Sequence, residues 1–350
     1  FFLAAAAFVL AACGGDASTD DATDTTDPAA DATEAPADAE GPLVVYTGRS
    51  QSLVDAAVDR FREETGMDIE VRYGSDAEIL AALQEEGDAS PADVFWANTA
   101  GALGAAVEAG LFESTPDSLL ERPEAFVPSG GQWVPVTARF RTLAYDPGDI
   151  DPATLPASVL DIPQQSGFDG RMGWTPQYSS FQDFITALQI TEGEEAARQW
   201  VEGVQALNPV AYTSNTAMLE ALAAGDIDVA LTNHYYILRV TEADSTDTDP
   251  VATHRFAPGD VGNLALVTGA GVLGTSDKDN AAAQFLSFLL SETSQRSAAE
   301  DTYEYPVVGL DTPGYLVPLD DARQLGPEID FEQLRDIDGT LALLRDQGLL

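Results

Sequence analysis

The feature that most constrains the fold of this chain is a regular alternation of short apolar runs with amphipathic segments. Leu43–Tyr46 has the pattern of a strand, and the apolar residues that follow recur at helical spacing until Gly66, which favours a helix end. Repeated alternation of this kind predicts a parallel α/β sheet. The predicted elements are a strand over 43–46, a helix over 53–61, a strand over 69–73, a helix over 76–86, a strand over 92–96 and a helix over 101–109.

A second alternating series follows a long predicted strand over 141–146, and a predicted strand over 262–273 leads back toward the first series. The roughly 310 residues from Pro42 onward are too many for one ordinary core and suit two lobes. Two crossings between lobes predict a hinge. The chain therefore resembles a periplasmic-type binding protein, whose ligand lies in a cleft between closing lobes. The other predicted elements are strands over 171–174 and 228–232 and helices over 181–190, 194–207, 216–224 and 280–300.

Two adjacent tyrosines, Tyr235 and Tyr236, stand at the end of the apolar run 228–232. Phenolates are hard oxygen donors, and a trivalent metal can displace a phenol proton that otherwise leaves at about pH 10. Neighbouring side chains of a regular strand point to opposite faces, so the pair can converge on one ion only if the strand ends there and turns. Two interpretations stay open from the residues alone: a ferric ligand pair, or two half-buried aromatics near a strand end.

The N-terminal residues 1–13 form an apolar stretch that ends in Leu-Ala-Ala-Cys13. The stretch is too short to span a bilayer and is typical of the apolar core of a secretory signal. Its end resembles the bacterial lipobox, which would make Cys13 the lipid-carrying residue of a membrane-anchored lipoprotein. Because Cys13 is the only cysteine, it has no partner for an internal disulfide. Residues 14–41 are acidic, rich in Ala, Thr and Pro, and predicted to be a disordered tether.

The chain is strongly acidic, with a formal net charge of −43 and Lys278 as its single lysine. Such a charge excludes nucleic-acid binding and favours a solvated surface. The two histidines, His234 and His254, cannot form a three-histidine metal site, and the Gly-x-Ser-x-Gly motif of serine hydrolases is absent from the sequence. We therefore expect no enzymatic activity.

From residue 43 to about residue 320 the chain resembles the ferric-ion-binding proteins that feed ABC transporters. The resemblance implies a two-lobed α/β fold of periplasmic-binding-protein type II, with two hinge-crossing strands and a ligand cleft between the lobes. It implies phenolate ligands to Fe(III) at Tyr235 and Tyr236. The segments that carry the resemblance are Val45–Arg49, Ser90–Phe95, Ala138–Asp146, Gly225–Tyr236 and Glu304–Pro306.

The chain departs from the best-known members of the family at two positions. Those members have a histidine and a glutamate ligand where this chain has Ser50 and Asn98. Other members lack both residues and use a third tyrosine together with a synergistic anion such as carbonate or phosphate. Tyr178 is the matching candidate here, and a loop aromatic without a ligand role is the alternative.

An anion beside the ion calls for positive and hydrogen-bonding groups, and Arg139 and Arg141 match an Arg-x-Arg stretch of the family. Ser180 with Asp183 also fits a helix-capping box. The same helix start offers free amides to an anion, as the family's loop does. His234 is expected to be a neighbour of the site. The other anion-side candidates are Ser179, Asn215 and Asn233, and the possible cleft-lining residues are Arg49, Ser50 and Asn98.

The sequence thus predicts a monomeric, lipid-anchored iron-capture protein at the outer face of the cytoplasmic membrane, with an ABC permease as its partner. We expect lobe 1 to comprise 42–140 plus 266–310, and lobe 2 to comprise 141–265 plus 311–350. One alternative keeps the fold but changes the cargo to an organic anion, a phosphate ester or an iron chelate. An alternative from another class is a surface-tethered hydrolase or adhesion module.

Overall fold

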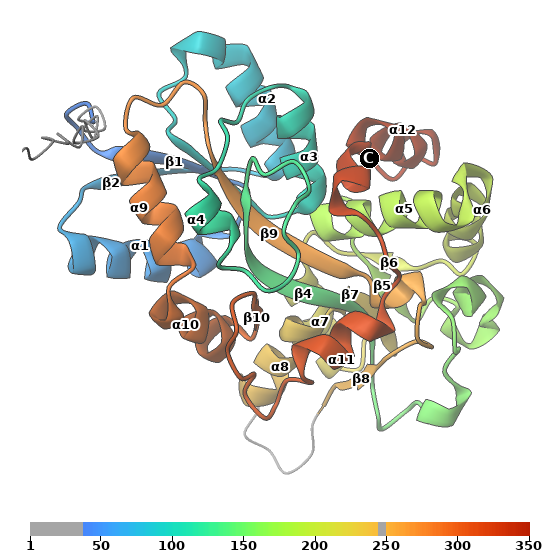
Figure 1. Cartoon of the computed structure of the whole chain (residues 1–350). Helices are drawn as coiled ribbons and strands as arrows, with labels where there is room; N and C mark the ends of the chain where they lie inside the picture. Colours follow the sequence, from blue (N-terminus) through green and yellow to red (C-terminus); the bar gives the residue numbers. More distant parts are fainter. Residues whose placement is uncertain (1–37, 244–249) are drawn as a thin grey trace, which may run out of the picture. The chain divides into compact units, whose positions relative to one another are not determined.

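The computed structural model describes residues 38–243 and 250–350, which form a mixed α/β arrangement around one long sheet (Figure 1). Cys13 and most of the predicted tether lie outside the described residues. The strands are β1 (Leu43–Thr47), β2 (Ile69–Tyr73), β3 (Val94–Ala97), β4 (Val134–Tyr145), β5 (Met172–Trp174), β6 (Val210–Ala211), β7 (Val229–Asn233), β8 (Ala252–His254), β9 (Ala265–Val272) and β10 (Tyr305–Pro306).

Twelve α-helices and six short 3₁₀ turns accompany these strands in the described part of the chain. The helices are α1 (Gln51–Thr65), α2 (Asp76–Glu86), α3 (Ala100–Glu108), α4 (Asp117–Leu120), α5 (Ser179–Glu192), α6 (Glu194–Gln205), α7 (Asn215–Ala223), α8 (His234–Ala243), α9 (Asp279–Leu289), α10 (Glu292–Thr302), α11 (Leu319–Leu325) and α12 (Ile337–Asp346). The 3₁₀ turns are η1 (Gly87–Ala89), η2 (Pro152–Thr154), η3 (Val159–Gln164), η4 (Ser166–Phe168), η5 (Val261–Asn263) and η6 (Phe331–Arg335).

The strand order is β2-β1-β3-β9-β4-β7-β5-β6, with β10 and β8 each pairing to β4. β1 is parallel to β2 and to β3, so the parallel α/β start predicted from the sequence is confirmed. β9 then runs antiparallel to both β3 and β4. We call β1, β2, β3, β9 and β10 the first half of the sheet, and β5, β6, β7 and β8 the second half.

The long strand β4 joins the two halves (Figure 1). Its residues 134–140 pair with β9, and its residues 141–145 pair with β7 and β8. The predicted strand over 141–146 is therefore only the second part of β4. Its first part was missed because Pro135 and the register shift between Pro135 and Thr137 interrupt the strand pattern.

Separate apolar cores support the two halves. Around the first half, the ring of Phe61 packs edge-on against Phe285 at 5.1 Å between ring centroids. Around the second half, Phe184 packs against Trp200 at 5.2 Å and against Phe181 at 5.9 Å. Two of these pairs join neighbouring helices, α1 to α9 and α5 to α6, and each ring removes a large apolar area from water.

The predicted helix over 280–300 is wrong as one element. The chain forms α9 and α10, with Ser291 as the N-cap of α10. The Ser291 hydroxyl accepts a hydrogen bond from the backbone N–H of Ser294 at 3.2 Å, which satisfies one of the free donors of a new helix start. A serine with this local alternative favours a helix boundary over continuation.

The last residues of the predicted tether contact α9. The Asp38 carboxylate accepts hydrogen bonds from the backbone N–H groups of Asn280 at 3.0 Å and Ala281 at 2.8 Å. Asp38, which the sequence assigned to the tether, therefore contacts the folded part of the chain. None of the helices in the described ranges combines the length and the apolar character needed to cross a bilayer.

The C-terminal segment connects both halves. Leu316 and Ala322 pack in the core of the first half, whereas Leu343 and Leu344 pack in the core of the second half. Between them, η6 lies against α3. The segment after residue 310 is therefore shared between the two halves in its packing.

Candidate metal and anion site

The tandem tyrosines lie at the turn where β7 ends and α8 begins. β7 ends at Asn233, and Tyr235 and Tyr236 stand in the first turn of α8. In a helix, neighbouring side chains do not point to opposite faces as they do in a strand. The two rings accordingly lie together, with 4.2 Å between centroids and 32° between planes, and both are buried. The strand therefore ends just before the two tyrosines, as is required for both side chains to reach one ion.

Tyr178 reaches the same place from another element. It is the N-cap residue of α5, and its hydroxyl lies 2.9 Å from the Tyr236 hydroxyl. Three phenol groups from two segments, the start of α5 and the start of α8, thus converge. In the described ranges, no group of three or more His, Cys, Asp or Glu side chains is placed to hold a metal ion.

The environment keeps these phenols protonated at neutral pH. Burial raises the pKa of Tyr235 to about 12, and Tyr178 adds to the effect while Arg139 opposes it. Burial and the neighbouring phenol also raise the pKa values of Tyr178 and Tyr236. A ligand that uses these oxygens as phenolates must therefore displace protons, which a strongly charged cation can do.

Two buried arginines stand beside the phenols. Arg139 donates from Nη2 to the carbonyl of Asn98, and Arg141 donates from Nη1 to Oδ1 of Asn233 at 3.2 Å. Burial, with the charge of Arg139 adding to it, lowers the pKa of Arg141 to about 9, and Tyr235 and Tyr236 oppose that shift. Arg139 Nη1 and Arg141 Nε and Nη2 are buried donors without a partner in the described structure. Two adjacent cations with unused N–H groups suit an anion.

Further unused donors belong to residues that the sequence placed on the anion side. Asn215 begins α7 and Asn233 ends β7, and both are fully buried. Nδ2 of each asparagine and Oγ of Ser180 have no partner in the described structure. Buried polar groups are normally hydrogen-bonded, so this set of donors indicates a place for an oxygen-rich ligand.

Ser50, Asn98 and Ser179 lie next to this set. Asn98 donates from Nδ2 to Oγ of Ser179 at 2.9 Å, which joins the segment after β3 to the start of α5. Ser50 is exposed, and its hydrogen bond to Tyr178 opposes a small part of the rise that burial causes in the pKa of Tyr178. Neither Ser50 nor Asn98 offers a charged ligand atom. Both are hydrogen-bonding residues at the point where the two halves meet.

The predicted capping box at Ser180 is wrong. The N-cap of α5 is Tyr178, and it makes no side-chain cap hydrogen bond. Asp183 faces α3 instead, where the backbone N–H of Gly101 donates a hydrogen bond to its carboxyl group. Burial raises the pKa of Asp183 to about 8, with Asp76 adding to the shift and Arg139 opposing it. The tertiary contact with α3 prevails over the local cap.

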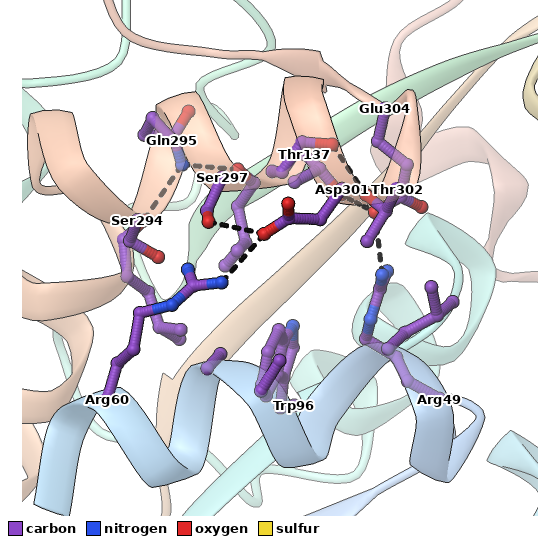
Figure 2. A pocket seen from close by; sticks show the side chains of 16 residues that line it. Arg49, Arg60, Trp96, Thr137, Ser294, Gln295, Ser297, Asp301, Thr302 and Glu304 are labelled. Atoms are coloured by element: carbon purple, nitrogen blue, oxygen red, sulfur yellow. Dashed lines mark hydrogen bonds and ion pairs between the residues drawn. The ribbon is translucent and has the colours of Figure 1, made fainter.

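Arg49, which was predicted as a possible cleft-lining residue, forms a buried ion pair with Glu304. Its Nη2 lies 2.7 Å from Oε2 of Glu304, and that oxygen also accepts a hydrogen bond from the Thr137 hydroxyl at 3.0 Å (Figure 2). Figure 2 also shows Trp96 beside Arg49, and the guanidinium carbon lies 5.4 Å from the ring centroid. Burial disfavours the Glu304 carboxylate, but Arg49 and Arg139 outweigh this and hold its pKa below the usual range. Arg49 lines the cleft while anchored to Glu304.

His234 uses both ring nitrogens for internal contacts. Nδ1 accepts a hydrogen bond from the backbone N–H of Phe140 at 3.2 Å, so Nε2 carries the proton and donates to the carbonyl of Tyr303 at 2.8 Å. Burial lowers the pKa of His234 to about 4. The ring therefore pins the start of α8 to β4 and to the end of α10, as a neighbour of the tyrosines.

A large cavity adjoins one of the three phenols, Tyr178. Its volume is about 840 Å³, and it opens between α2 and α3 on one side and α5 and α12 on the other. Such a volume exceeds what a bare metal ion with a small anion requires and lies in the range of pockets for small organic molecules. Its lining includes Arg49, Ser50, Asn98, Gln177, Tyr178 and Ser179.

Comparison with known proteins assigns the family. The model of the family described as bacterial extracellular solute-binding protein matches residues 56–308. The chain belongs to this family.

Relatives of this solute-binding protein are named for iron. An Fe(3+)-binding periplasmic protein of Serratia marcescens is 30% identical over 315 residues, covering 89% of this chain and 92% of that protein. Iron uptake protein A2 of Synechocystis is 33% identical over 288 residues and covers 79% of each chain. The ferric-ion-binding family predicted from the sequence is confirmed.

Solved structures of iron-binding proteins also superpose on this chain. Iron-bound HitA from Pseudomonas aeruginosa superposes with a TM-score of 0.83 at 31% identity, covering 88% of this chain and 99% of that chain. A Trichodesmium protein (IdiA, FutA) in complex with iron and citrate ligands has a TM-score of 0.73 at 25% identity, covering 89% of this chain and all of that chain. The type II periplasmic-binding-protein fold predicted for this solute-binding protein is confirmed.

Three carboxyl groups that this solute-binding protein buries near the site, those of Asp76, Asp183 and Glu304, were not among the predicted site residues. Asp76 accepts hydrogen bonds from the Asn98 backbone N–H at 2.9 Å and the Thr99 hydroxyl at 2.8 Å. The sequence predicted Asp183 only as the capping partner of Ser180, and Glu304 only as part of a segment that resembles the family. Their partners lie between 22 and 255 positions away in sequence, so no local pattern reveals them.

Proposed function

We propose that this solute-binding protein captures Fe(III) with the phenolate oxygens of Tyr178, Tyr235 and Tyr236. The observation that carries the proposal is the convergence of the three phenols, with 2.9 Å between two hydroxyls and 4.2 Å between the paired rings. The iron named in the relatives and in the bound HitA structure supports the same cargo.

The charge balance of the site favours a trivalent ion. Three phenolates would neutralise three positive charges, so the ion and its ligands would add no net charge to a buried place. The raised pKa values of the phenols mean that their protons must leave as the ion enters. Affinity should therefore fall as pH falls, because protons compete with iron for the same oxygens.

A synergistic anion completes the proposed site. Arg139 and Arg141 would hold it, with Ser180, Asn215 and Asn233 donating further hydrogen bonds through atoms that have no partner in the described structure. Carbonate or phosphate fits this role, because each offers several oxygens to a fork of N–H donors. The N-termini of α5 and α7 add positive potential at the same place.

A second candidate is iron that arrives with an organic chelator. The cavity of about 840 Å³ beside Tyr178 would accommodate a small polycarboxylate, and the Trichodesmium relative is described with iron and citrate. In this version the chelator would take the place of the small anion. The phenols and arginines would keep their roles.

The two halves of the sheet support the two-lobe mechanism expected for the family. We propose lobes that meet at residues 140–141 of β4 and near residue 265 of β9, where strand pairing changes partners. Lobe closure would bring Asn98 and Ser179 together over the ion. Release to an ABC permease would require opening at this contact, with binding and release as the only chemistry and no enzymatic step.

The N-terminal segment supports a proposal about the place of action. We propose that Cys13 carries a lipid and anchors a monomeric protein to the outer face of the cytoplasmic membrane, with the acidic segment after it as a spacer. Replacement of Cys13 by serine should release the protein from membranes without changing iron binding.

A visible absorption titration tests the proposed cargo. Ferric iron is added to the whole protein in bicarbonate buffer, beside the double variant Tyr235→Phe/Tyr236→Phe. Tyrosinate bound to Fe(III) absorbs strongly by charge transfer, so the wild type should develop a saturable coloured band that the variant lacks. No band with bicarbonate, phosphate or citrate would refute ferric binding by these residues, whereas a band only with ferric citrate would select the chelate version.

A further inference from the structure

Arg239 lies over the outer face of the tyrosine pair. It stands on α8, four positions after Tyr235 and three after Tyr236, so helical spacing places it on the same side as both rings. The guanidinium carbon is 5.0 Å from the ring centroid of Tyr235 and 5.9 Å from that of Tyr236. Arg239 is half-buried, unlike the fully buried Arg139 and Arg141 on β4.

This contact changes strength with the charge of the rings. A neutral phenol attracts a guanidinium only through the partial negative charge of its face. A phenolate carries a full negative charge that is shared between oxygen and ring, so the same guanidinium is attracted more strongly at the same distance. The α8 backbone already holds Arg239 in place, so no rearrangement is needed when the rings ionise.

Among the side chains that the structure describes, those of residues 38–241 and 250–350, no carboxylate forms an ion pair with Arg239. Arg239 also does not line the cavity beside Tyr178. Its contact with the two rings is therefore separate from the anion-binding role of the β4 arginines.

We propose that Arg239 is a positioning and tuning residue that stabilises the phenolate forms of Tyr235 and Tyr236 from outside the coordination sphere. By doing so it strengthens ferric binding and lowers the energy of the filled phenolate orbitals from which charge transfer starts. The inference rests on the proposed function, because it presupposes that the two tyrosines bind Fe(III).

The test compares Arg239→Met with Arg198→Met in the whole protein. Methionine keeps an unbranched side chain but removes the charge, and Arg198 on α6 supplies the same change of net charge at an exposed pair with Glu195. Arg239→Met should bind ferric iron about tenfold more weakly, and its charge-transfer band should move to longer wavelength. Arg198→Met should match the wild type in both. Arg239→Lys, which restores a cation, should move the band back toward the wild-type position.

The position of the band separates tuning from damage to the fold. Only iron-loaded protein absorbs there, so partial unfolding lowers the height of the band but does not move its maximum. An unchanged maximum in both Arg239→Met and Arg239→Lys, with affinity equal to that of Arg198→Met, would overturn the proposal. Absence of the band from the wild type would instead contradict the proposed function, so the two failures are distinguishable.

Discussion

At the scale of single residues, the proposed iron site consists of oxygen atoms that only a folded chain brings together. Tyr235 and Tyr236 are neighbours in sequence, and their chemistry could be predicted from that adjacency. Tyr178 lies 58 positions from Tyr236, yet their hydroxyls are 2.9 Å apart. Tyr178 was predicted as a third ligand only because the chain resembles the ferric-ion-binding family. Its proximity to the pair follows from the parallel pairing of β5 with β7, which places the segments after both strands at one edge of the sheet.

Replacement of Tyr178 by phenylalanine tests whether the third phenol is a ligand. The change removes one oxygen and leaves the ring packing, so the protein should stay folded while ferric affinity falls by about 100-fold, equal to roughly 3 kcal/mol. A competitive titration against a soluble chelator measures this. Tyr73→Phe, which removes a hydroxyl from β2 in the first half of the sheet, is the matched control and should bind iron as the wild type does. Equal affinities for the two variants would show that Tyr178 is only a neighbour.

At the scale of elements, the alternating pattern predicted most strands and helices because it depends on local burial. Asp76–Glu86 is predicted and observed with the same bounds, since Ser75 and Glu78 form a capping box at its start. The failures have long-range causes. Asp183 resembled a local cap partner but contacts α3, whose sequence lies more than 70 positions earlier. The contact between Asp183 and α3 decides the role of this side chain, and a local sequence pattern cannot reveal such a contact.

The junction between α3 and η6 gives a prediction at this scale. A Cβ atom added to Gly101 would lie 2.9 Å from the backbone oxygen of Leu334 and 2.7 Å from Oδ1 of Asp183. Gly101→Ala should therefore destabilise the protein by about 1–3 kcal/mol, despite the better helix propensity of alanine. Urea unfolding measures the difference. Gly167→Ala is the control, because no atom lies within 4 Å of its added Cβ. A Gly101→Ala protein as stable as this control would contradict the packing of α3 against η6.

At the scale of the whole molecule, two buried carboxyl groups face each other across the proposed cleft. Asp76 stands at the start of α2 and Asp183 on α5, which belong to opposite halves of the sheet. Burial raises the pKa of Asp183 to about 8, above its value of about 3.9 in an unfolded chain. Stability from the protonated Asp183 is therefore fully present below about pH 4 and is lost as pH rises through about 8.

Asp183→Asn should remove this pH dependence. The amide cannot ionise, so the variant should melt above the wild type at pH 8 by the equivalent of about 5 kcal/mol, and the difference should vanish near pH 4. Thermal unfolding of the iron-free protein between pH 4 and pH 8 provides the measurement. The exposed Asp161→Asn controls for the loss of one negative charge. Parallel melting curves for Asp183→Asn and the wild type over the whole range would rule out the buried, protonated carboxyl.

In the proposed site, three phenolates hold one ferric ion. Anomalous diffraction at the iron absorption edge, from crystals of the iron-loaded protein, locates that ion. We expect one peak within bonding distance of the hydroxyl oxygens of Tyr178, Tyr235 and Tyr236, with an oxygen-rich anion between the peak and Arg139 or Arg141. A peak elsewhere in the cavity, without bonds to Tyr235 and Tyr236, would contradict the proposed site.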